Sequence, residues 1–270
     1  VRRGLAESRT QAHTLILEGR VHVGGAPADR PSRLVSPAEA LTVSGPPPRY
    51  VSRGGHKLEA ALDRFGLDVA GLEVLDAGAS TGGFTDCLVQ RQAAHVVAVD
   101  VGRGQLHNRM LRHPGVTSIE RRNIRQGGTA GLPGAPYALV VADLSFISLR
   151  TVAGPLVDLT RSDGDLVLLV KPQFEAGRVE VSAGRGVIVD PEVWLRALRD
   201  VGSAFPSQGA TMMGAMVSPL RGADGNVEFL VHLRRARPGR PDPAPAVDLA
   251  AVTTRRTASA SRSARTGFMT

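Results

Sequence analysis

Lys57 and Lys171 are the two lysines of this chain, and the other 31 of its 33 cationic side chains are arginine. An arginine stays protonated at any accessible pH, whereas a lysine can lose its proton and act as a base. A sequence that uses arginine wherever a generic cation suffices is expected to keep lysine where a neutral amine must act. The alternative is that both lysines lie by chance on a solvated face.

Two acids belong with these lysines. Asp143 follows a predicted strand over residues 138–142, and Lys171 follows another over 165–170. The carboxyl ends of parallel strands meet at the edge of the sheet where ligands bind, so the two side chains are expected there. Glu228 lies in the apolar stretch GNVEFLVHL, and Lys57 lies at the head of a predicted helix. Such a set of groups could remove a proton from a hydroxyl.

The stretch LEVLDAGASTGGFTDCL, residues 72–88, predicts a buried strand, a glycine-rich turn and the start of a helix. Gly78, Gly82 and Gly83 lack a Cβ where the turn would pass a ligand, and the first amides of the helix would face it. The spacing G-x-x-x-G-G is neither that of dinucleotide binders nor that of a P-loop. An ordinary tight turn between strand and helix is the alternative.

The rest of this region alternates strands with helices. HVVAVD, residues 95–100, predicts a second strand that ends in Asp100, and an acid there is the usual partner of a ribose diol. Asn123 follows a third strand, over 116–120. Helices are expected over 105–111, 144–159 and 191–205, and two closing strands over 211–217 and 227–233. This alternation predicts an α/β fold with a mainly parallel sheet and helices on both faces.

Four segments are expected along the chain. Residues 1–44 predict a small α+β domain, with a helix over 8–17 and then short strands. The prolines of residues 45–50 predict a stiff linker. Residues 51–235 hold the α/β domain. Residues 236–270 lack apolar periodicity and predict a disordered basic tail.

The net charge of +8 is concentrated at the two ends of the chain. Residues 1–34 carry +3, residues 234–270 carry +6, and the part between them is nearly neutral. Basic ends on a neutral body predict a nucleic-acid partner, although the charge could also serve solubility. The single cysteine, Cys87, and the absence of zinc-ligand spacing predict a reducing, cytoplasmic location and no metal. No apolar run is long enough to predict a membrane span.

Several phrases carry a resemblance to a known family. VSRGGHKL, LDAGASTGGFTDCL, VADLSFISL, VKPQFEAGR and GNVEFL are similar to the TlyA family, and VRRGLAESRTQAHTLILEGRVHVGG resembles an alpha-L RNA-binding domain. The resemblance covers residues 1–234. It implies a Rossmann-like, FtsJ-like methyltransferase domain that uses S-adenosylmethionine to methylate ribose 2′-hydroxyls of cytidines in ribosomal RNA. Because the family's opening helix is absent, we expect residues upstream of Val1.

The resemblance also implies roles for individual residues. Lys57, Asp143, Lys171 and Glu228 match the Lys-Asp-Lys-Glu tetrad of FtsJ-like 2′-O-methyltransferases, with Lys171 as the base. The expected cofactor site consists of Asp76, Gly78, Ser80, Thr81, Gly82, Gly83, Phe84, Asp100, Asn123 and Asp143. Arg3, Arg9 and Arg20 are expected to contact ribosomal RNA or a ribosomal subunit through the phosphate backbone.

Three other functions stay open from the sequence. They are an RNA-binding protein with an inactive methyltransferase fold, the membrane activity suggested by the family's haemolysin label, and an NAD-dependent oxidoreductase. The sequence leaves open which nucleotide and subunit are modified, and the oligomeric state.

Overall fold

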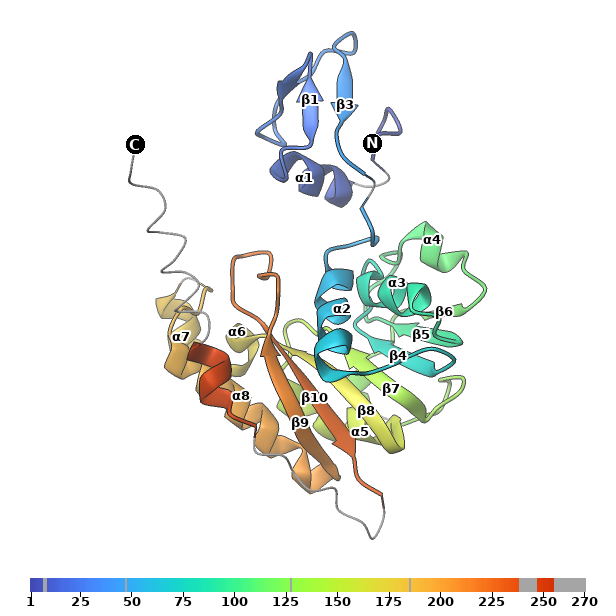
Figure 1. Cartoon of the computed structure of the whole chain (residues 1–270), viewed down its shortest axis with the longest axis vertical. Helices are drawn as coiled ribbons and strands as arrows, with labels where there is room; N and C mark the ends of the chain where they lie inside the picture. The colour runs from blue at the N-terminus through green and yellow to red at the C-terminus, as the bar shows by residue number, and fades with distance from the viewer. Residues whose placement is uncertain (7–8, 47, 127, 185, 238–246, 255–270) are drawn as a thin grey trace. The chain divides into compact units, whose positions relative to one another are not determined.

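The computed structural model describes residues 1–6, 9–46, 48–126, 128–184, 186–237 and 247–254 (Figure 1). The chain divides into two compact units, Val1–Ser52 and Arg53–Thr270. The division falls just after the predicted linker at residues 45–50.

The first unit contains one helix and a small antiparallel sheet. Helix α1 (Arg9–Leu17) is followed by strands β1 (Val21–Val23), β2 (Ala26–Pro27) and β3 (Leu41–Val43), in the sheet order β2-β1-β3. Ser8, the predicted first residue of the helix, lies outside the described residues. Leu15 of the helix and Val23 of the sheet are both buried.

The second unit is built on a seven-stranded sheet with the order β6-β5-β4-β7-β8-β10-β9. Its strands are β4 (Glu73–Ala77), β5 (His95–Val99), β6 (Val116–Ile119), β7 (Tyr137–Ala142), β8 (Thr160–Val170), β9 (Ala210–Val217) and β10 (Phe229–Arg235). The five strands from β6 to β8 pair in parallel, and β10 pairs antiparallel with both β8 and β9. The central strands read as near-continuous apolar runs because both faces of the sheet are covered.

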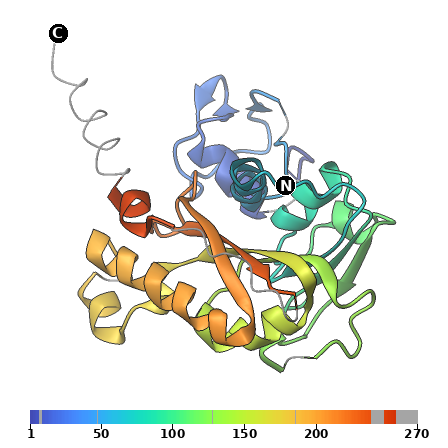
Figure 2. The same cartoon turned by 60° about the horizontal axis from the view of Figure 1, so that its bottom comes forward.

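Helices cover the two faces of this sheet (Figure 2). The α-helices are α2 (Gly54–Phe65), α3 (Gly83–Gln90), α4 (Asn108–Leu111), α5 (Ala153–Asp158), α6 (Pro172–Glu175), α7 (Arg178–Ala183) and α8 (Pro191–Ala204). Short 3-10 helices are η1 (Ile124–Gln126), η2 (Leu149–Val152) and η3 (Pro206–Gln208). Leu75 and Val140 point to one face and pack with α5 and α8. Helices α2 and α3 pack together on the opposite face.

Several segments differ from the sequence prediction. Strand β8 begins at Thr160, before the predicted residue 165, and helices α6 and α7 were not predicted. The helix expected over 144–159 is a loop, then η2, then α5, and Phe146 in that loop has a φ of 64°, which no helix accommodates. The helix expected over 105–111 is only the four residues of α4. In the predicted tail, residues 249–254 form a short helix, and Val247, Leu249 and Val252 pack against the core. The remaining parts of that tail, 238–246 and 255–270, lie outside the described residues.

The topology brings the predicted site residues to one edge of the sheet. Asp143 follows the end of β7, and Lys171 follows the end of the adjacent strand β8. Because β10 runs antiparallel to β8 and Phe229 pairs with Val170, Glu228 enters the sheet at the same edge. Asp76 and Asp100 come from the ends of β4 and β5, so they reach this edge as well.

Candidate active site

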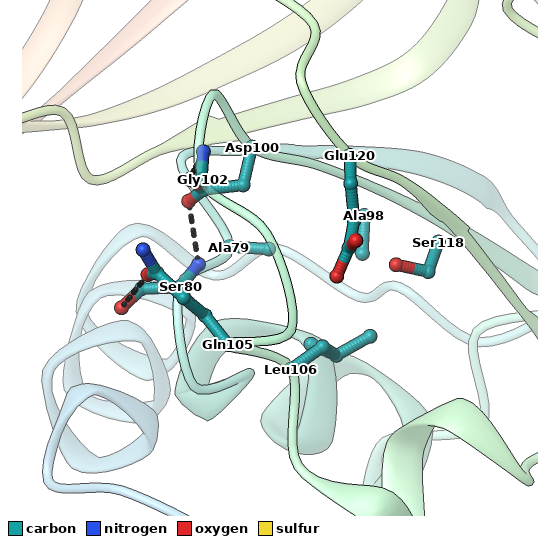
Figure 3. Close-up of a pocket in the computed structure, with 9 residues that line it drawn as sticks. All are labelled: Ala79, Ser80, Ala98, Asp100, Gly102, Gln105, Leu106, Ser118 and Glu120. Carbon is teal, nitrogen blue, oxygen red and sulfur yellow. Dashed lines mark hydrogen bonds between the residues drawn. The ribbon is translucent and has the colours of Figure 1, made fainter.

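A pocket lies at this edge, beside the glycine-rich turn (Figure 3). It is lined by Ala79, Ser80, Ala98, Asp100, Gly102, Gln105, Leu106, Ser118 and Glu120. The Asp100 carboxylate accepts hydrogen bonds from Ser80 N at 2.8 Å and Gly102 N at 2.7 Å. The Ser80 bond ties the turn to the loop after β5, and the Gly102 bond lies within that loop. A carboxylate has about four acceptor positions, so Asp100 can still accept from a ligand hydroxyl.

The glycines of the turn are required by close packing. Gly78 has a φ of 82°, and a Cβ on it would lie 2.5 Å from the Asp143 carbonyl oxygen. Gly82 has a φ of 95°, and its Cβ would lie 2.8 Å from Leu106 Cδ1. The missing Cβ atoms therefore let the turn pack against β7 and against the pocket segment around Leu106. The sequence prediction gave a different reason, namely room for a ligand.

The rest of the turn is also held in place. Ser80 adopts a φ of 47°, and its hydroxyl donates to Gln105 Oε1 at 3.2 Å. The Thr81 carbonyl accepts from His107 N at 3.1 Å. Gly83 begins α3, and Phe84 is buried. These bonds fix the turn backbone beside the pocket.

Asp76 is a fully buried acid in β4, just before the turn. Its Oδ2 accepts a hydrogen bond from Thr85 Oγ1 at 2.6 Å, while Oδ1 has no hydrogen-bond partner among the described residues. Burial raises the pKa of Asp76 to about 7, the Thr85 bond opposes that shift, and the nearby carboxylates of Asp143 and Asp100 add to it. A buried carboxylate with an unpartnered oxygen is a good partner for a cation.

The four residues of the predicted tetrad form two lysine–carboxylate pairs. Lys57 Nζ lies 2.5 Å from Glu228 Oε2, and both side chains are buried. Lys171 Nζ lies 2.6 Å from Asp143 Oδ1, and these side chains are 11% and 26% exposed. The second pair is therefore the one that a substrate can reach.

The loop after β7 and the segment after Lys171 are joined at several points that the sequence did not predict. Lys171 Nζ donates to Ser145 Oγ at 2.9 Å, and the rings of Phe146 and Phe174 lie 5.3 Å apart. Glu175 accepts hydrogen bonds from Ser148 Oγ at 2.5 Å and Leu149 N at 2.8 Å. Burial raises the pKa of Glu175, and these two bonds oppose the shift. The loop after β7 and helix α6 together form one continuous platform beside Lys171.

Phe146 is the exposed member of this platform. Its side chain is 91% exposed, and its φ of 64° is strained for a residue that has a Cβ. Strain of this kind persists where the surroundings hold it, and here Glu175 and Phe174 do so. An exposed aromatic ring beside Lys171 offers a surface on which a flat ligand can stack.

Four predicted site residues have positions that bear on their proposed contacts. Asn123 does not line the pocket, and its Oδ1 accepts from Arg125 N at 3.0 Å. Arg3 donates to the carbonyls of Ser36, Pro37 and Glu39, and Arg20 donates to those of Ser44 and Pro46. Both arginines thus brace their own unit. Arg9 is exposed on α1. Their roles toward cofactor and RNA stay predictions.

Sequence reasoning missed Glu120 and Ser118 in the pocket wall. Glu120 follows β6, where an acid occupies the same position as Asp100 does after β5, and this repeated pattern could have identified it. Its Oε1 accepts from Gly104 N at 2.6 Å. No comparable signal marked Ser145 or Phe146, because their positions depend on a loop that the sequence predicted as helix.

Comparison with known proteins identifies both units. Residues 50–235 match the model of the FtsJ-like methyltransferases, and residues 1–41 match that of the S4 domain. The chain belongs to the FtsJ-like methyltransferase family. This assignment confirms the predicted α/β methyltransferase fold with a small N-terminal domain, and with it the predicted enzyme class.

Individual relatives of this FtsJ-like methyltransferase are similar over most of their length. The 16S/23S rRNA (cytidine-2′-O)-methyltransferase TlyA of Mycobacterium tuberculosis is 50% identical over 235 residues, which are 87% of each chain. Hemolysin A of Brachyspira hyodysenteriae is 37% identical, over 85% of this chain and 95% of its own. A solved structure titled putative hemolysin, from Streptococcus thermophilus, is 34% identical with a TM-score of 0.78, over 98% of this chain and 95% of its own. These relatives confirm the resemblance to TlyA-type proteins.

Two further observations concern the alternatives. No helix in the described part of the methyltransferase is long and apolar enough to cross a membrane. Within the same residues, no group of three or more His, Cys, Asp or Glu side chains is arranged to hold a metal ion.

Proposed function

We propose that this FtsJ-like methyltransferase transfers a methyl group from S-adenosylmethionine to the ribose 2′-hydroxyl of a cytidine in ribosomal RNA. The observation that carries the proposal is the Lys171–Asp143 pair, partly exposed at the edge of the sheet and supported by the buried pair of Lys57 and Glu228. The substrate is named from the 50% identical mycobacterial relative, an rRNA (cytidine-2′-O)-methyltransferase.

The residues at the pocket fit S-adenosylmethionine. Asp76 presents an unpartnered buried carboxylate oxygen, which suits a cationic ligand, and it lies near the acids Asp100 and Asp143. Asp100 and Glu120 line the pocket and would accept hydrogen bonds from the ribose and adenine parts. When bound, S-adenosylmethionine supplies a methyl group on a positively charged sulfur, which is already strongly electrophilic.

The protein's own task is then to place a hydroxyl in line with that methyl group and to accept its proton. Lys171, as a neutral amine, accepts the proton of the 2′-hydroxyl. Asp143, 2.6 Å from that amine, stabilises the ammonium that forms. Glu228 holds Lys57, and the buried pair keeps a second cation at this edge.

RNA recognition in this proposal uses both units. The S4 domain contacts the phosphate backbone, with the exposed Arg9 as its clearest candidate, and Arg3 and Arg20 maintain the domain that presents it. The exposed ring of Phe146 stacks on a base near the target ribose.

Ribosomal RNA from cells with and without the gene tests the proposal. Primer extension at low dNTP concentration should show stops that depend on the gene and on an intact Lys171. Mass spectrometry of the corresponding fragment should show one added methyl group on a cytidine ribose. Identical stops and masses in both strains would contradict the proposal.

A further inference from the structure

The amine of Lys171 has a second acceptor next to it, Ser145, which lies outside the tetrad. Lys171 Nζ donates to Ser145 Oγ at 2.9 Å. Its contact with Asp143 is an ion pair that lacks hydrogen-bond alignment, so the Ser145 bond is the one that fixes the direction of an N–H. We infer that Ser145 is a positioning residue that aims the Lys171 lone pair at the hydroxyl to be methylated, an inference that rests on the proposed function.

The geometry of a neutral amine explains this role. Such a nitrogen has two N–H bonds and one lone pair, arranged tetrahedrally with its bond to carbon. A serine hydroxyl can accept, so one N–H bond points to Ser145, and this bond fixes the rotation of the amine about its Cε–Nζ bond. The other N–H lies on the side of the Asp143 carboxylate, whose negative charge repels a lone pair. The lone pair is left in the remaining direction. Without Ser145 the amine can rotate about its Cε–Nζ bond, and the lone pair loses its fixed direction.

The proton and methyl transfers balance with this arrangement. The bond from the 2′-oxygen to the methyl carbon forms as the bond from that carbon to sulfur breaks. The 2′-hydroxyl proton moves to the lone pair of Lys171. The resulting ammonium keeps its hydrogen bond to Ser145 and its ion pair with Asp143, and it carries the new proton in the third direction.

Ser145 is delivered by a loop that is fixed at both ends. At the start, Asp143 N donates to the Ala77 carbonyl at 3.0 Å, which joins the loop to β4. At the end, Glu175 accepts from Leu149 N at 2.8 Å. The left-handed backbone of Phe146 directly follows Ser145 and sets the direction in which the loop turns. The loop therefore holds the Ser145 hydroxyl in place beside Lys171, although the residue itself is exposed.

Single-turnover methyl transfer to ribosomal subunits tests the inference. Ser145→Ala should lower the rate by about tenfold or more, the effect of one hydrogen bond to a reacting charged group. The Kd values for S-adenosylmethionine and for the subunit should stay within about twofold, because Ser145 binds neither. Ser145→Thr keeps the hydroxyl and should restore the rate. Ser207→Ala removes an equally exposed hydroxyl from η3 and serves as the matched control.

Each other outcome is decisive. A Ser145→Ala rate equal to or above that of the unmodified chain would overturn the inference, as would an equal loss of cofactor affinity. A loss that Ser145→Thr does not restore would show that the hydroxyl is not what matters. If the unmodified chain itself transfers no methyl group to the subunits, the proposed function fails, and that result is distinct from a failure of Ser145 alone.

Discussion

At the scale of single residues, the proposed chemistry depends on a group that can hold a lone pair. Lys171 is one of two lysines among 33 cationic side chains, and the structure places its amine against Asp143 and Ser145. Arginine would keep the charge and could keep the ion pair. It could not accept a proton, because its guanidinium stays protonated.

Lys171→Arg should therefore lose at least about a hundredfold in single-turnover rate, within the 10²–10⁴ expected of a general base. Thermal unfolding and S-adenosylmethionine affinity should be unchanged, which excludes a packing defect. Lys57→Arg is the comparison, and we expect a smaller loss because it keeps a cation beside Glu228. A Lys171→Arg rate within about tenfold of the unmodified chain would move the base role elsewhere.

The raised pKa of Asp76 predicts how the stability of the fold depends on pH. Burial raises its pKa from 3.8 to about 7, a shift that corresponds to roughly 4 kcal/mol. A raised pKa favours the protonated form in the folded state. The stability that goes with a protonated Asp76 is fully present below the unfolded-state pKa of 3.8, and it is lost as the pH rises through the folded-state pKa of about 7.

Asp76→Asn should therefore unfold at a higher temperature than the unmodified chain at pH 8.5, and this advantage should disappear by pH 4. The same substitution should weaken S-adenosylmethionine binding, because it removes the negative charge that faces the cation. Thermal scans across this range and calorimetric titration measure the two effects. Asp158→Asn, at an exposed position at the end of α5, should show neither effect. No gain in stability at pH 8.5 would mean that the burial penalty is absent.

At the scale of elements, the loop after β7 shows where local sequence and function conflict. The sequence predicts a helix that starts at Leu144, yet residues 143–148 form a loop that places Phe146 in a left-handed backbone. The structure holds this strain with Glu175 and Phe174, which lie on the segment after Lys171. Strain that is held in this way is characteristic of functional sites.

Phe146→Gly should relieve the backbone strain and remove the exposed ring. We expect an unfolding temperature no lower than that of the unmodified chain, together with a fall in kcat/KM for the ribosomal substrate of about tenfold, since stacking on one base contributes about 1–3 kcal/mol. Phe146→Trp should retain activity, because it keeps an aromatic surface. Unchanged kcat/KM in Phe146→Gly would exclude stacking at this position.

The strands and the site were predictable from the sequence to different degrees. Buried apolar runs identified β4, β5, β7 and β8, and the rule that ligands bind at their carboxyl ends placed Asp143 and Lys171 together. Glu228 reached the same edge only because β10 runs antiparallel to β8, a tertiary pairing that local pattern does not specify. Ser145 and Phe146 depend on backbone angles set by Glu175, about 30 positions along the chain, so no local pattern indicated them.

At the scale of the whole molecule, the residues that pack against the core come before the last cluster of arginines in the chain. The family match ends at residue 235, but Val247, Leu249 and Val252 still pack against the core of the methyltransferase unit. Those few apolar residues were too short a stretch to show a helical period in the sequence. Beyond Thr254 the chain adds four arginines and no acid. The packed part and the charged part can therefore be separated by truncation.

A chain that ends at Thr254 should fold with an unchanged unfolding temperature, whereas one that ends at Arg237 should unfold at a lower temperature because it lacks the packed residues. Removal of residues 255–270 alone should weaken binding to all RNAs alike, since arginines that bind phosphates carry no sequence information. Removing one arginine that neutralises a phosphate flattens the log–log salt dependence of binding by about 0.7–0.9, so the four arginines account for at most roughly 3 in slope.

Arg9→Ala provides the contrast, because this exposed residue lies on α1 of the S4 domain. It should weaken binding to the ribosomal substrate more than binding to unrelated RNA, since in the proposed function the S4 domain positions the enzyme on its target. Filter binding of both RNAs over a range of salt concentrations measures the two variants side by side. Equal salt slopes for the unmodified chain and the chain ending at Thr254 would show that the terminal arginines bind no phosphate, and RNA binding would then depend on the two folded units alone.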